Sequence, residues 1–340
     1  MKQETQHWTE RKEISNKSGI SILLFFMKLV GPGFVKVLVI PVAFYYYLSS
    51  KETRRVSKRY LTRVHKAIRD SRFTEASQNN TREIPATALR YSVAGLLGLD
   101  RAQKVRWFHV YRHILAFSHS MVDRMFAWKY GLPESKYKGS DFDCLAEVLD
   151  GKGKGAIILV SHLGNFDVAI SRSHLNPETT FNIVINMRHS QTFNQFRGKI
   201  FSEKKVRFID PQDITPMTMI DLSQRIDQGE ILVIAADRTT TSDSSTSVGI
   251  KFLGAEANFP IGPFVLAHLL QSPVYTLFSI RKSGNFLIDF KLFKSQIQLP
   301  RSNRQAAITC YAAQYANQLE SNCKRYPFQW YNFFDFWSRD

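Results

Sequence analysis

The chain has 340 residues, of which 44% are hydrophobic and 13% aromatic, and its formal net charge is +17. This apolar content excludes an intrinsically disordered chain and is enough for one large domain or two small ones. The three cysteines are widely spaced and form no Cys-x-x-Cys pair, which argues against a disulfide-stapled fold. Unless the positive charge serves only solubility, it indicates a polyanionic partner: nucleic acid, anionic lipid or an acidic carrier protein.

The segment from Ile20 to Leu48 is apolar, but Lys28 and Lys36 interrupt it and a Gly-Pro-Gly sequence at residues 31–33 breaks it. Its longest charge-free run, residues 37–50, is shorter than the ~20 residues that a helix needs to cross a bilayer. Basic residues flank both ends, and such residues prefer the cytoplasmic side of a membrane. We therefore expect two short helices that dip into the cytoplasmic leaflet and return. A tilted spanning helix with its lysines at the interface, or a buried hairpin of a soluble protein, are the alternatives.

The chain accordingly divides into two predicted regions. Residues 1–53 form an N-terminal membrane-associated helical segment, and residues 54–340 form the main domain. This domain begins with a helical lead-in over residues 54–150, where apolar residues recur three or four positions apart.

Beyond this lead-in, short apolar runs alternate with helical segments. Continuous apolar runs are typical of strands that are covered on both faces, as in parallel sheets. The predicted strands lie at residues 156–161, 181–186, 231–236, 273–280 and 286–293. Helices are expected between several of them, for example at residues 217–228 and 261–271. The predicted fold class is therefore α/β, with a mostly parallel sheet flanked by helices.

One pair of histidines has the spacing of zinc ligands on a helix. His109 and His113 lie one turn apart, but Val110 stands where a metalloprotease motif requires glutamate. A packed amphipathic helix that carries two histidines explains them better. We expect neither a metal ion nor a cofactor.

Polar side chains follow three of the predicted strands. His162 follows the first strand, Arg188 the second, and Asp237 and Arg238 the third. In an open α/β sheet, functional groups gather at the carboxyl ends of strands. We therefore expect these side chains to meet at one rim of the sheet.

His162 is the predicted general base, because a neutral imidazole is suited to accept a proton near pH 7. Asp167, five residues later, is expected to accept the other ring N–H and so orient the imidazole. Gly164 would permit close approach of a substrate, and a helix starting here would aim free N–H groups at a developing oxyanion. Ser161 would point to the opposite side of the strand, so we expect direct activation of a hydroxyl or amine without a covalent intermediate.

Three blocks of the sequence resemble a known family. "SHLGNFD" is similar to the His-x4-Asp/Glu signature of the glycerolipid acyltransferase superfamily, and most of all to the bacterial lipid A late acyltransferases. Here Phe166 and Asp167 replace the Trp and Glu that this branch often carries. "NMRHSQTFNQF" resembles the family's arginine-centred block. The segment from "ADRTTT" to "FPIGPFVLAHLLQSPV" resembles a block in which an Asp follows a strand and Phe-Pro-x-Gly-Pro opens a helix.

The resemblance implies a glycerolipid-acyltransferase-like fold and transfer of a fatty acyl group. The donor would be acyl carrier protein or acyl-CoA, and the acceptor a lipid or glycolipid at the cytoplasmic face of a bacterial inner membrane. Arg188 would contact phosphate. His162 and Asp167 are thus the candidate catalytic residues, and the candidate substrate-binding residues are Gly164, Asn165, Arg188, Asp237, Arg238, Pro260 and Gly262.

Two other classes of function compete with this reading. A non-catalytic basic protein that binds anionic lipid or nucleic acid would explain the charge, but not the His, Asp and Arg side chains at one rim. An esterase could use the same His/Asp pair to activate water. Because the acyltransferase explains the most features, we expect a membrane surface as a partner and no nucleic acid.

Overall fold

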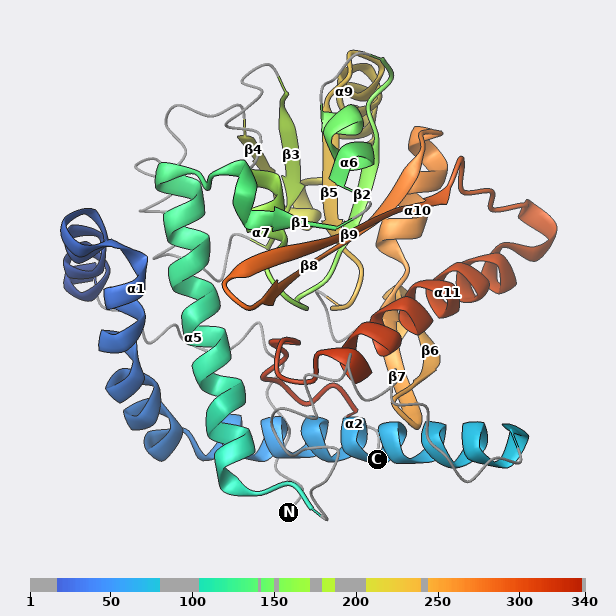
Figure 1. Cartoon of the computed structure of the whole chain (residues 1–340). Helices are drawn as coiled ribbons and strands as arrows, with labels where there is room; N and C mark the ends of the chain where they lie inside the picture. Colours follow the sequence, from blue (N-terminus) through green and yellow to red (C-terminus); the bar gives the residue numbers. More distant parts are fainter. Residues whose placement is uncertain are drawn as a thin grey trace.

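The computed structural model describes residues 17–79, 104–139, 142–149, 153–171, 179–186, 206–239 and 244–337. A central sheet lies between two groups of helices, and a long N-terminal helix stands beside the domain (Figure 1). The fold is α/β with a mostly parallel sheet, as the sequence predicts.

The central sheet has seven strands in the order β1-β9-β8-β2-β5-β3-β4. All neighbouring pairs are parallel except β8 and β9, which form an antiparallel hairpin. The strands are β1 (Tyr137–Lys138), β2 (Ile157–Val160), β3 (Phe181–Val184), β4 (Val206–Ile209), β5 (Ile231–Ala235), β8 (Val274–Lys282) and β9 (Asn285–Lys294). The five predicted strands are therefore confirmed.

Four further strands were not predicted from the sequence, and each has a weak sequence signal. β1 has two residues, and β4 is a half-exposed edge strand of four residues. β6 (Ser247–Phe252) and β7 (Ala255–Pro260) form a separate antiparallel hairpin, which turns at Leu253 and Gly254 with positive φ angles. Such angles suit a tight hairpin turn.

Eight helices are described in these parts of the chain. They are α1 (Lys17–Ser49), α2 (Lys51–Asn79), α5 (Trp107–Tyr130), α6 (Phe142–Leu149), α7 (Phe166–Ile170), α9 (Pro216–Asp227), α10 (Gly262–Leu270) and α11 (Arg304–Arg325). Short 3₁₀ turns lie at Glu134–Lys136, Pro211–Asp213, Ser244–Thr246 and Arg301–Asn303. The helices predicted at residues 217–228 and 261–271 correspond to α9 and α10.

Helices cover both faces of the sheet, which is why the central strands β2 and β5 are apolar. Along β2, Ile157 and Leu159 pack into a core that includes residues of α10 and α11. Ile158 and Val160 pack on the other face, where α5, α6 and α7 contribute. β2 thus buries alternate residues on opposite faces, as parallel strands do.

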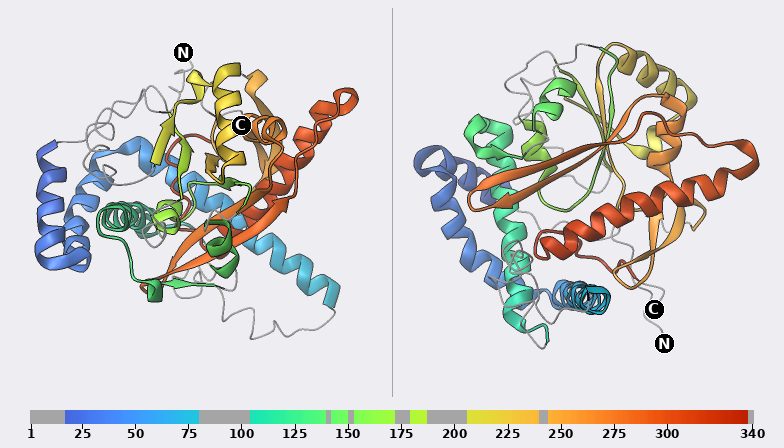
Figure 2. Two further views of the ribbon diagram at one scale, coloured as in Figure 1. Left: turned by 90° about the horizontal axis from the view of Figure 1, so that it is seen from above. Right: turned by 45° about the vertical axis from the view of Figure 1, so that its right-hand side comes forward.

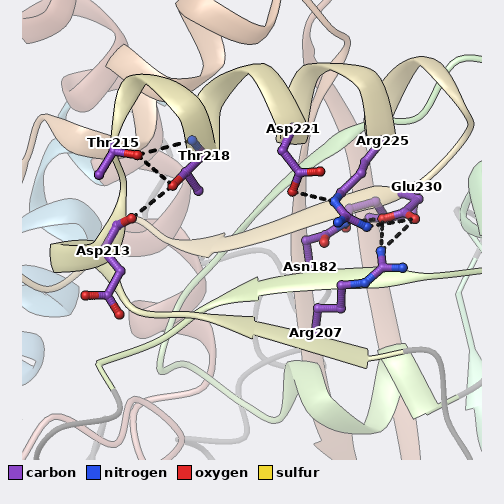
Figure 3. Close-up of polar contacts among 9 residues, drawn as sticks. Asn182, Arg207, Asp213, Thr215, Thr218, Asp221, Arg225 and Glu230 are labelled. Atoms are coloured by element: carbon purple, nitrogen blue, oxygen red, sulfur yellow. Dashed lines mark hydrogen bonds and ion pairs between the residues drawn. The ribbon is translucent and has the colours of Figure 1, made fainter.

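Polar contacts hold the amino ends of three parallel strands (Figure 3). Glu230, directly before β5, accepts hydrogen bonds from Arg207 of β4 and Asn182 of β3. These contacts fix the end of the sheet opposite the carboxyl ends of β2 and β5, where the candidate catalytic residues lie. At the other end of α9, after β4, Thr215 caps this helix by accepting a hydrogen bond from the N–H of Thr218.

The N-terminal helix α1 is kinked within the Gly-Pro-Gly sequence, at Gly31, where φ is +77°. This bend agrees with the expected break between two helices. Figures 1 and 2 show α1 alongside α5, with α2 crossing beneath α11. The position of Lys36 contradicts the alternative of a tilted helix with both lysines at the membrane interface. Its ammonium pairs with Asp123 of α5 and is largely buried. Lys28 is exposed.

From Met27 on, where its side chains are described, the surface of α1 is mostly apolar and open. Residues 27–49 are long and apolar enough to cross a membrane by length and composition, and most of this stretch is not buried in the protein. Beyond the kink, residues 32–49 form a helix of about 27 Å at 1.5 Å per residue, slightly less than the ~30 Å of bilayer hydrocarbon. Its exposed large side chains include Phe34, Val37, Leu38, Ile40, Val42, Phe44, Tyr45, Tyr46 and Leu48.

Candidate active site

His162 and Asp237 occupy equivalent positions on adjacent parallel strands. Val160 at the end of β2 pairs in register with Ala235 at the end of β5, and each candidate residue lies two positions further on. The Asp237 carboxylate contacts His162 twice. Oδ1 is 2.9 Å from the ring Nδ1, and Oδ2 accepts the backbone N–H of His162 at 2.9 Å. Strand register alone thus brings the imidazole and the carboxylate together.

Asp237 is fully buried, yet its carboxylate has three hydrogen-bond donors. Besides His162, the indole N–H of Trp330 donates to Oδ2 at 2.9 Å. Burial raises the pKa of Asp237, but His162, Arg238 and the Trp330 indole more than offset this, so its pKa lies below the usual value. The carboxylate is therefore ionised at neutral pH.

This pairing fixes the tautomer of His162. An ionised carboxylate can only accept, so Nδ1 carries the proton and Nε2 keeps its lone pair. Burial and the charge of Arg238 lower the pKa of His162, although Asp237 opposes them. About 30% of the side chain remains exposed. The ring is thus a neutral base at pH 7 with its second nitrogen free of Asp237.

Asp167 lies elsewhere, which corrects the expected pairing with His162. Its carboxylate accepts the indole N–H of Trp128 at 3.0 Å and pairs with Arg124 at 2.6 Å, both from α5. Asp167 sits in the first turn of α7, and its side chain is directed toward α5. The carboxylate on the imidazole belongs to Asp237, a residue expected only in substrate binding.

The structure requires glycine at position 164 for a reason other than the expected approach of a substrate. Its φ is +72°, and an added Cβ would lie 2.1 Å from the carbonyl oxygen of Ser279 in β8. Its N–H donates to the carbonyl of Gln329 at 2.7 Å, and the N–H of Asn165 donates to Ser279 at 2.8 Å. These two N–H groups therefore bind protein carbonyls, contrary to the expectation that they would face an oxyanion.

The Asn165 side chain also binds within the protein. Its amide Nδ2 donates to the carbonyl of Ser120 in α5 at 2.9 Å, and the residue is buried. Pro260 ends β7 opposite Ser247, and Gly262 begins α10, where an added Cβ would meet no atom within 4 Å.

Two arginines lie near His162, and one of them was not predicted from the sequence. Arg238 donates to the carbonyl of Tyr331 at 2.6 Å, and burial lowers its pKa to about 10. Arg124 is the missed one: its side chain is 34% exposed, it pairs with Asp167, and its charge lowers the His162 pKa. It comes from a helix with no recognisable motif, so only the three-dimensional fold reveals it. Arg188 lies outside the described residues.

Comparison with known proteins shows the family of the chain. The sequence model of bacterial lipid A biosynthesis acyltransferases matches residues 110–339, which include the sheet, His162 and Asp237. No curated protein matches the chain. The matched region covers more than half of the chain and contains the predicted site, so the chain is an acyltransferase that belongs to the bacterial lipid A biosynthesis acyltransferase family.

Proposed function

We propose that the protein transfers a fatty acyl group from an acyl carrier protein thioester to a hydroxyl or amine of a membrane lipid or glycolipid. The observation that carries this proposal is the hydrogen bond between His162 Nδ1 and Asp237. It leaves Nε2 of a neutral imidazole available to accept a proton. Acyl-CoA is the alternative donor.

The reaction follows from this arrangement. Nε2 of His162 takes the proton of the acceptor as its oxygen or nitrogen attacks the thioester carbonyl. The new ester or amide bond forms, the carbon–sulfur bond breaks, and the imidazolium returns the proton to the thiolate. Asp237 stabilises the imidazolium between these steps. Arg188, Arg238, Pro260 and Gly262 remain the proposed substrate-binding residues, whereas the amide groups of Asn165 bind protein carbonyls.

Membrane attachment would place the site close to its acceptor. The exposed apolar side chains of α1 suit the acyl region of a bilayer, and Trp107 and Phe108 at the start of α5 are also exposed. Basic residues near the start of α2 suit anionic headgroups, as does the net charge of +17. We place the protein at the cytoplasmic face of the bacterial inner membrane, where an acidic carrier protein would also favour a positive surface.

The test is acyl transfer by the full chain in lipid nanodiscs. Labelled acyl-carrier-protein thioester or acyl-CoA is supplied with a bacterial inner-membrane lipid extract, and products are identified by mass spectrometry. We expect a lipid heavier by one acyl group, formed faster from the carrier protein, and none with heat-inactivated protein. Release of free fatty acid without an acylated lipid would identify a hydrolase and overturn the proposal.

The pH dependence follows from the lowered pKa of His162. The base must be neutral to act, so kcat/KM is expected to stay level through pH 7 and to fall only below pH ~6.5, by about tenfold per pH unit. A fall that begins well above this value would contradict the assignment. Because burial lowers the pKa of His113 to about 4, acid also destabilises the fold, so activity must be shown to return after neutralisation.

A further inference from the structure

The C-terminal aromatic segment forms a strap along the catalytic loop. We use this name for residues 329–332, which lie beside the loop that carries His162. Leu163 and Trp330 form an antiparallel β-bridge. On either side of it, the backbone N–H of Gly164 donates to the carbonyl of Gln329 at 2.7 Å, and the backbone N–H of Tyr331 donates to the carbonyl of His162 at 2.9 Å. The strap thus pairs with the loop as a short strand would, although the two are far apart in sequence.

Several side chains hold the strap in place. The Gln329 amide exchanges two hydrogen bonds of 2.9 Å with the backbone of Arg281 in β8. His113 Nε2 lies 2.8 Å from the carbonyl oxygen of Trp330, and the hydroxyl of Ser57 forms a hydrogen bond with His113 Nδ1. The strap is therefore anchored to the sheet, to α5 and, through His113, to α2.

The Trp330 side chain connects this strap to the catalytic pair. It is fully buried, and its ring packs on Tyr60 and Phe252. Its indole N–H donates to Asp237 Oδ2, the same oxygen that accepts the backbone N–H of His162. The carboxylate is thus held at both oxygens, with Oδ1 directed at the imidazole.

We propose that Trp330 is a positioning residue for catalysis: it orients the Asp237 carboxylate and limits how strongly that carboxylate attracts the imidazolium. The inference rests on the proposed role of His162. An N–H donor shares the carboxylate charge, so its removal leaves more of that charge for His162. The pKa of His162 should then rise. Among the described residues, the other ionisable groups that act on this pair include Arg124 from α5, Arg238, and Tyr315 and Cys323 from α11.

The test compares two tryptophans in one aromatic cluster. Trp337 is also buried, and its ring centroid is 6.1 Å from that of Trp330, but its indole donates to the carbonyl of Phe252. For Trp330→Phe, we expect kcat to fall about tenfold with KM little changed, as when an outer partner of an active group is removed. The acid limb of the pH profile, where kcat/KM falls as His162 becomes protonated, should move to higher pH. Trp337→Phe should lower thermal stability without moving kcat or the acid limb.

A second variant separates positioning from folding. Benzothienylalanine at position 330 keeps the shape of the indole but replaces its N–H by sulfur. The His162 pKa is also measured directly, by NMR of isotope-labelled histidine with the signal assigned through His162→Ala. A higher pKa in the benzothienyl variant supports the inference even if no acyl transfer is found. An unchanged pKa and kcat in that variant, or equal effects of both Trp→Phe variants, would overturn it.

Discussion

Replacing His162 by alanine is expected to lower acyl transfer by about 10²–10⁴-fold, which is the contribution of a general base. The loss should appear in kcat, because the imidazole acts on the proton that moves during the reaction. Folding should survive, since the backbone N–H of residue 162 still reaches Asp237 and the Trp330 donor remains. Asp237 is therefore not left as a buried charge without a partner.

His268→Ala provides the matched control. His268 is a half-buried histidine of α10 that bonds a backbone carbonyl, that of Ile297, at 3.1 Å. Its removal should leave turnover within about twofold, while both variants keep native circular dichroism and melting behaviour. Turnover of His162→Ala within tenfold of the native protein would exclude His162 as the base.

The sheet could be predicted from sequence because its strands are fully buried. The runs at residues 157–160 and 231–235 are apolar without alternation, and the run at 181–184 is apolar except for Asn182; this pattern indicates cover on both faces. β1 and β4 carry no such signal, because one is very short and the other is half exposed at the sheet edge. A run of apolar residues indicates a buried strand, so the buried strands could be predicted and the short or exposed ones could not.

The partner of His162 could not be predicted from local spacing. Asp167 follows His162 by only five residues and was therefore the expected partner, whereas Asp237 is 75 residues away. The two positions become neighbours only through the register of β2 and β5, which no local pattern specifies. Lys36 and Asp123 show the same limit: an apparent interruption of an apolar helix is half of a long-range ion pair.

The aromatic C-terminal segment was the least interpretable part of the sequence. Its aromatic residues follow no helix or strand period, so the sequence alone does not show what they contact. The structure gives Trp330 and Trp337 similar packing but different hydrogen-bond acceptors. Packing therefore explains why the segment is aromatic, and the acceptor at Asp237 is what distinguishes one tryptophan from the other.

Asparagine substitutions at Asp237 and Asp167 should separate the two acids. Asp237→Asn is expected to reduce kcat by about 10³–10⁴-fold, since loss of the carboxylate in Ser-His-Asp enzymes costs about 10⁴-fold through the wrong tautomer and a less stable imidazolium. Asp167→Asn keeps an acceptor for Trp128 and loses only the charge facing the partly exposed Arg124. We expect it to cost about 1 kcal/mol of stability and less than tenfold in kcat. A larger kcat loss for Asp167→Asn than for Asp237→Asn would reverse the assignment.

The direction in which the acid limb of the pH profile shifts distinguishes these variants, whereas a loss of activity alone does not. Asp237 raises the pKa of His162, so Asp237→Asn should lower that pKa further and move the acid limb of the residual activity to lower pH. Trp330→Phe should move it the other way, because the carboxylate then attracts the imidazolium more strongly. Asp167→Asn should shift it little, since Asp167 reaches His162 only through the charge of Arg124. Opposite shifts at Asp237 and Trp330 are the result expected if one hydrogen-bonded chain runs from the indole through the carboxylate to the base, and shifts of the same sign would show that no such chain operates.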